Sequence, residues 1–144
     1  MNFERNAPAA ARKIAAPDVI EPPAGTFSNC RVAGGLVFVS GQHAGSSGGA
    51  IGGASMLAQA REALRRVIAL VTAAGASRAD IIKLTVFVTD MSRRNEVTAA
   101  RREAFREPFP CSTLVEISAL AEPDLLVEIE ATAVLPDSKQ GSGS

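Results

Sequence analysis

The chain contains no tryptophan and no tyrosine, and charge of neither sign is in excess. Fifteen basic and fifteen acidic residues cancel formally, so nothing draws the whole protein toward nucleic acid or an anionic membrane. Single-stranded nucleic acid is usually held by aromatic side chains in a basic groove, and no such surface is indicated here. We therefore expect neither a nucleic-acid nor a membrane partner.

Cysteine and histidine are also scarce, with two and one in the chain. Cys30 and Cys111 lie far apart, and only His43 could join them, so neither a zinc site nor a disulfide framework is predicted. The first residues lack the apolar stretch of a secretory signal, and no hydrophobic run approaches the length of a membrane span. The prediction is a cytoplasmic protein with reduced thiols, without metal or cofactor.

Common phosphate-binding and hydrolase motifs are also absent. The glycine-rich stretch from residue 45 to 53 is not followed by Gly-Lys-Ser/Thr, and no Gly-x-Ser-x-Gly occurs. Pairs of arginines at 93–94 and 101–102 are typical of a solvated helix face, with a binding patch as the alternative.

Length and composition indicate one domain. With 144 residues, 47% of them hydrophobic, the chain can bury a core of its own. Prolines interrupt residues 1–24, which we expect to be an irregular lead. The domain is expected over residues 25–136. Residues 137–144 have the composition of a flexible tail, or of an expression linker.

Apolar periodicity gives the order of elements within that domain. Two strands are expected around Gly34-Gly35, a helix follows the N-cap Ser55, and a second helix starts at Asp90 or Ser92. The expected strands cover residues 27–33, 36–40, 81–88, 112–118 and 125–134. The order β-β-α-β-α-β-β predicts an α+β fold, a single sheet with two helices on one face.

Two features of this sheet follow from alternation along its strands. In the strand over 81–88 the buried face should carry Ile82, Leu84, Val86 and Val88. The face away from the helices mixes apolar and charged side chains, which predicts self-association. Its expected members are Phe38, Lys83, Phe87, Leu126, Glu128 and Glu130.

Several motifs in this order resemble the Rid family, also called YjgF-like, of reactive intermediate deaminases and L-PSP endoribonuclease-like proteins. The quoted segments span 37–42, 73–77, 80–91, 110–117 and 125–131. The resemblance covers roughly residues 25 to 134. It implies a chorismate-mutase-like subunit that assembles as a homotrimer around a central barrel, with ligand clefts between subunits.

The resemblance also implies roles for individual residues. Glu128 matches the acid that polarises the attacking water. The remaining matched positions would line the substrate cleft: Phe27, Ser40, Gly41, Thr98 (or Ala99, depending on where the extra residue of this helix is placed), Cys111 and Ser112.

Position 112 departs from the family pattern. The deaminating members carry an arginine there, which holds a substrate carboxylate, and here the residue is Ser112. A guanidinium offers a charged, two-pronged donor, whereas a hydroxyl offers one neutral donor. We therefore expect a subgroup with altered ligand choice, unless another cation such as Arg31 or Arg102 enters the cleft.

Two classes of function stay open from the sequence. One is an enzyme that deaminates a small imine or enamine, or runs a divergent hydrolase, lyase or tautomerase-type reaction, with Glu128 as acid or base. The alternative is a non-catalytic small-molecule-binding or regulatory trimer. Glu128 could instead be a surface charge, Cys111 a buried apolar residue, and His43 an ordinary loop histidine.

Overall fold

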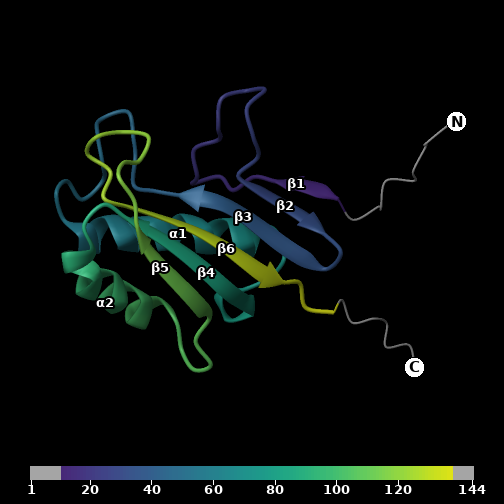
Figure 1. Cartoon of the computed structure of the whole chain (residues 1–144). Coiled ribbons are helices and arrows are strands. Elements are labelled where there is room, and N and C mark those ends of the chain that lie inside the picture. Colours follow the sequence, from purple (N-terminus) through teal and green to yellow (C-terminus); the bar gives the residue numbers. More distant parts are fainter. Residues whose placement is uncertain (1–10, 138–144) are drawn as a thin grey trace, which may run out of the picture.

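The computed structural model describes residues 11–137, which form one six-stranded sheet with both α-helices on one face (Figure 1). The strand order is β1-β2-β3-β6-β4-β5, and every neighbouring pair is antiparallel except β4 and β5, which are parallel. The elements are β1 (Arg12–Ile14), β2 (Cys30–Ala33), β3 (Leu36–Gln42), α1 (Met56–Ala73), β4 (Ile81–Val88), α2 (Arg94–Ala104), β5 (Cys111–Glu116) and β6 (Val127–Val134). Short 3-10 turns, Arg78–Asp80 and Met91–Arg93, precede β4 and α2.

This architecture confirms the predicted α+β fold with two helices on one face. Helix α1 starts where predicted, because the Ser55 hydroxyl accepts a hydrogen bond from the Ala58 N–H at 3.1 Å. It ends just before Gly75, whose φ of 99° only glycine adopts without strain. The core lies between α1 and the sheet, where α1 packs against β3 and β6.

The buried face of β4 is not the predicted one at its first residues. Ile81 is 3% exposed and Ile82 is 47% exposed, the reverse of the expected alternation. The pairing of β4 with β6 shifts register between Ile81 and Lys83, so one extra residue turns Ile82 outward. From Leu84 onward the alternation agrees with the prediction.

The N-terminal lead contains one strand that the sequence did not predict. Strand β1 pairs with β2, and Ile14, Ala16 and Val19 are buried against the core. The described part of residues 1–24 is therefore packed onto the domain, although prolines break its regular structure. Residues 1–10 and 138–144, with nearly all of the expected tail, lie outside the described residues.

The sheet face opposite the helices is only partly polar. Phe38, Val115 and Val134 are 46%, 37% and 39% exposed there. Strand β5 forms one edge of the sheet and is exposed along most of its length. Leu126, expected on this face, instead precedes β6 and packs against the core. No helix within residues 11–137 is long and apolar enough to cross a bilayer.

Candidate functional site

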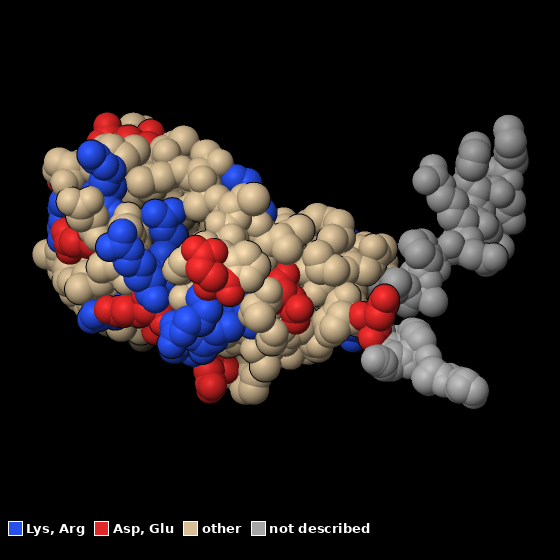
Figure 2. Space-filling model, turned by 90° about the horizontal axis from the view of Figure 1, so that it is seen from below, with Lys and Arg blue, Asp and Glu red and all other residues tan. Residues whose placement is uncertain are grey.

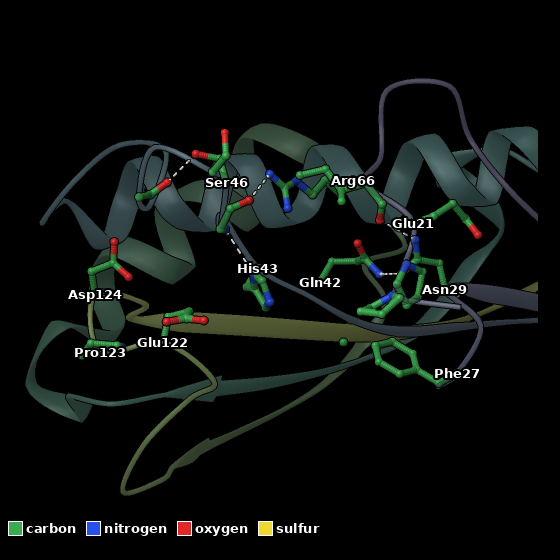
Figure 3. A pocket seen from close by; sticks show the side chains of 17 residues that line it. Glu21, Phe27, Asn29, Gln42, His43, Ser46, Arg66, Glu122, Pro123 and Asp124 are labelled. Atoms are coloured by element: carbon green, nitrogen blue, oxygen red, sulfur yellow. Dashed lines mark hydrogen bonds between the residues drawn. The ribbon is translucent and has the colours of Figure 1, made fainter. Parts of the chain in front are cut away.

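A large cavity opens at the end of strand β3 and has a volume of about 770 Å³. Four parts of the chain form its walls: residues 20–29, the end of β3 with the loop after it, Arg66 of α1, and the loop of residues 122–124 before β6 (Figure 3). Phe27 and Gly41, two of the residues predicted from the sequence, line it. Its size suits a small metabolite.

Gly41 and Glu128 are brought into direct contact on neighbouring strands. A Cβ atom at position 41 would lie 2.5 Å from Oε1 of Glu128, so only a glycine leaves room for this carboxylate. Glu128 is half-buried, and within residues 11–137 its carboxylate forms no hydrogen bond and no ion pair. A carboxylate held in place without a partner is free to accept a proton or a ligand hydrogen bond.

Ser40 lies beside this pair, but its hydroxyl already has a partner. It donates to the carbonyl of Ser28 at 2.6 Å, which ties β3 to the segment before β2. Ser40 and Phe27 line a second, shallower cavity of about 700 Å³ on the open face of the sheet, together with Arg31 and Phe38. Phe27 therefore separates two concave surfaces.

Buried amides hold the inner wall of the large cavity. Gln42 Nε2 donates to Asn29 Oδ1 at 3.2 Å, and Asn29 Nδ2 donates to the carbonyl of Ile20 at 2.9 Å. Both side chains are visible in the lining in Figure 3. They fix the segment that carries Phe27 to the end of β3.

Charged groups hold the opposite wall. Arg66 donates to Glu62 at 2.7 Å and to the carbonyl of Gly45 at 2.8 Å. Hydrogen bonds from Arg65 and Arg66 hold the pKa of the Glu62 carboxyl below its ordinary value. The guanidinium of Arg66 thus stabilises the loop after β3 from inside the protein.

His43 stands in the same lining with one nitrogen already engaged. Its Nδ1 accepts a hydrogen bond from the Gly45 N–H at 3.0 Å, so the neutral ring carries its proton on Nε2. The side chain is half-buried and borders the cavity (Figure 3). His43 can therefore offer an N–H donor to a ligand.

A second cluster lies between α2 and β5, on the face of the sheet that the helices cover. Arg101 donates from Nη1 to Ser112 Oγ at 2.5 Å and from Nη2 to Thr98 Oγ1 at 3.2 Å. A cavity of about 300 Å³ adjoins this group, with Thr98 and Arg101 in its lining. The sequence indicated a neutral site at position 112, whereas the structure places a cation in contact with Ser112.

Cys111 does not join this cluster. It pairs with Lys83 across β4 and β5, while Ser112 pairs with Leu84, whose side chain is buried beneath the helices. Successive strand residues point to opposite faces, so the exposed Cys111 thiol lies on the open face.

One subunit does not bring Glu128 and Ser112 together. Glu128 pairs with Phe87 and Ser112 pairs with Leu84, three residues away along β4 and on the other face. Two strand spacings and three residues along the strand separate their Cα atoms by about 14 Å. The predicted site residues thus form two groups: Phe27, Ser40, Gly41 and Glu128, and separately Thr98 and Ser112.

Arg101 is the functional candidate that the sequence reasoning missed. The sequence suggested Arg31 or Arg102 as a cation for the site, but within residues 11–137 the hydrogen bond to the Ser112 hydroxyl comes from Arg101. Arg101 lies three residues after Thr98 in a helix, and residues at this spacing share a face. The three-residue spacing from Thr98 could therefore have identified Arg101 as a site residue from the sequence.

The described residues give no sign of a metal centre. Between residues 11 and 137, no three His, Cys, Asp or Glu side chains come together as a cation site requires.

The fold places the protein in the chorismate-mutase-like α+β class, and solved structures agree. A crystal structure of a YjgF/YER057c/UK114 family member from Mycobacterium tuberculosis is 36% identical, with a TM-score of 0.73, over 85% of this chain and 98% of that one. The YjgF gene product of Escherichia coli is 34% identical, with a TM-score of 0.75, over the same shares of the two chains.

The family model described as Endoribonuclease L-PSP matches residues 19–135. The chain belongs to this family, which includes the Rid or YjgF-like proteins that its motifs resemble. A RutC family protein of Pyrococcus horikoshii is 36% identical over 112 residues, 77% of this chain and 88% of that protein. The 2-iminobutanoate/2-iminopropanoate deaminase of Escherichia coli is 43% identical over 84 residues, 56% of this chain and 65% of the enzyme.

Proposed function

We propose that the protein hydrolyses the C=N bond of a small imine, or of the enamine in equilibrium with it, with Glu128 as the acid and base. The observation that carries the proposal is the half-buried Glu128 carboxylate, which lies over Gly41 of the cavity lining and has no hydrogen-bond or ion-pair partner within residues 11–137. The name of the Escherichia coli relative, a 2-iminobutanoate/2-iminopropanoate deaminase, supports this class of substrate.

The chemistry needs one group that moves protons in both directions. Glu128 accepts a proton from water as the water oxygen bonds to the imine carbon, and passes this proton to the imine nitrogen, which becomes an amino group. Glu128 then takes the proton of the new hydroxyl group and delivers it to the amino nitrogen. The C–N bond breaks as the C=O bond forms, so ammonia and a carbonyl compound are released and Glu128 is again a carboxylate.

We propose further that the cleft is completed by a second copy of the chain in a homotrimer. Glu128 and Ser112 lie about 14 Å apart on opposite faces of one sheet, so no single small ligand reaches both within one subunit. The partly apolar open face supports association, because exposed apolar surface of this kind usually finds a partner. Light scattering should give three times the chain mass, and a monomer at micromolar concentration would contradict the assembly.

The test of the reaction is ammonia release from 2-aminoacrylate, measured against buffer. Wild type should accelerate it, and Glu128→Gln, which keeps the shape but loses the base, should be slower by about 100-fold or more. Gly41→Ala should also slow it, because the new Cβ would displace the carboxylate. Equal rates for wild type and Glu128→Gln would remove Glu128 from the mechanism.

The second candidate is a binding protein without turnover, and Ser112 is the observation that favours it. In this proposal the clefts accept a small metabolite. Phe27 and, from the second cavity, Phe109 and Pro110 just before Ser112 contribute to their walls. Thermal stabilisation by a metabolite that is recovered unchanged would support binding alone. The family description mentions an endoribonuclease, but zero net charge and the lack of Trp and Tyr give RNA little to bind. A cytoplasmic location stays a prediction.

A further inference from the structure

The guanidinium of Arg101 is held in a fixed position by two hydroxyl groups. It donates to Ser112 Oγ at 2.5 Å and to Thr98 Oγ1 at 3.2 Å, from the last turn of α2. These contacts come from two elements, the helix itself and strand β5. A long side chain that is restrained in this way loses little further freedom when it binds a ligand.

Its charge is not compensated by any acid within the described part of the chain. The ion pairs formed between residues 11 and 137 engage five arginine or lysine partners, and Arg101 is not among them. Burial, and after it the nearby charge of Arg102, lower the pKa of the Arg101 guanidinium. A guanidinium has five N–H donors, and the two hydroxyl groups leave several of them free for an anion.

The adjoining cavity has the size and lining for a small, partly apolar anion. Its volume is about 300 Å³, at the lower end for ligand sites. Apolar side chains make up most of the wall beside the two arginines: Leu84, Phe105, Phe109 and Pro110. Figure 2 shows Lys and Arg side chains, interspersed with Asp and Glu, at the end of the molecule where α2 lies. Apolar walls favour a short hydrocarbon chain, and the guanidinium favours a planar anion.

We infer that Arg101 anchors the carboxylate of a small monocarboxylic ligand, with Ser112 and Thr98 as the residues that position it. Serine suits position 112 because its hydroxyl oxygen accepts the Arg101 N–H, whereas a second guanidinium there would repel the first. Binding at this site does not depend on any catalysed reaction. Its use for a substrate of Glu128 rests on the function proposed above.

The test is binding of butanoate, with butanamide as the uncharged molecule of the same shape, followed by NMR titration in buffer of low ionic strength. Wild type should bind butanoate at least tenfold more tightly than butanamide. Arg101→Gln should raise the Kd for butanoate about ten- to hundredfold, because a charge-assisted hydrogen-bond pair is lost. Arg94→Gln is the matched control: it removes one exposed arginine from the start of the same helix, and its Kd should change less than about twofold.

Two further variants separate anchoring from folding. Arg101→Lys keeps the charge but loses the planar fork, so its affinity should lie between those of wild type and Arg101→Gln. Ser112→Ala keeps the guanidinium and loses one restraint, and should weaken binding about threefold. Circular dichroism spectra should confirm that each variant is folded.

Three results would each overturn the inference: wild type without butanoate binding at 100 mM probe, equal affinity for butanoate and butanamide, or equal effects of Arg101→Gln and Arg94→Gln. Butanoate contains no C=N bond, so its binding is independent of turnover. Butanoate binding without ammonia release would leave Arg101 in its role and remove the proposed reaction. Ammonia release with an unchanged KM in Arg101→Gln would support the proposed reaction and remove Arg101 as the carboxylate anchor.

Discussion

Gln59 joins helix α1 to both loops that approach the large cavity, and its replacement should measurably destabilise the protein. The side chain is fully buried, and its Nε2 donates to the carbonyls of Gly53 and Asp124 at 2.7 and 2.9 Å. Its Oε1 accepts the Leu126 N–H at 2.9 Å. Gln59→Met keeps the volume and removes all three hydrogen bonds.

The size of the stability loss in Gln59→Met depends on whether each backbone group that loses its hydrogen bond can reach water. Leu126 is half-buried, so its N–H would lack a partner, at a cost of about 1–3 kcal/mol. Gly53 and Asp124 are exposed, and their carbonyls can turn to water, at a cost of about 0.5 kcal/mol each. The more apolar methionine offsets about 1 kcal/mol of this total. We expect a free energy of unfolding lower by about 2 kcal/mol and a Tm lower by roughly 4–10 °C.

The assay is urea unfolding followed by far-ultraviolet circular dichroism, since the chain has no tryptophan or tyrosine for intrinsic fluorescence. All proteins are compared at one chain concentration, because association would contribute to stability. Thr72→Met, at an exposed position late in α1, is the control and should change stability by less than about 0.5 kcal/mol. If Gln59→Met were no less stable than this control, the hydrogen bonds of Gln59 would not hold the loops as argued.

Two titrating groups give predictions with a defined direction in pH. The Glu62 pKa is lowered by Arg65 and Arg66, so the ionised Glu62 contributes to folding stability above pH 4.5. This contribution is lost as the pH falls through the lowered pKa. Glu62→Gln leaves the buried Arg66 without its acidic partner. In urea titrations the free energy of unfolding should fall by about 2–3 kcal/mol at pH 7 and by less at pH 3. An equal loss of stability at both pH values would refute the pairing. Burial raises the pKa of Cys30 from 9.0 to about 11, so stability should fall between pH 9 and 11 as the unfolded thiol ionises first. Cys30→Val should remove this fall. In wild type, iodoacetamide at pH 8 should modify the exposed Cys111 in the folded protein but Cys30 only after unfolding, as mass spectrometry of the peptides can show. Rapid labelling of Cys30 in the folded protein would contradict its burial.

Local signals in the sequence were enough to predict most elements of the fold. Ser55 caps α1 as predicted, and Gly75 follows its end, because both act through the backbone next to them. The motifs around Gly41 and Glu128 likewise identified the family, since their order along the chain is itself the evidence.

Contacts between distant segments decided the rest. Ile82 turns outward because β4 slips against β6, a pairing that no local pattern around residue 82 records. Strand β1 is a strand only because β2 lies beside it.

The sequence by itself determined the elements, their order and the family, because these depend on neighbours along the chain. Only the tertiary structure decided which side chains meet. Arg101 and Ser112 are eleven positions apart and come together because α2 lies against β5, while Ser112 and Glu128 are kept on opposite faces by the pleat of the sheet. A cation that one strand lacks can therefore come from a neighbouring helix.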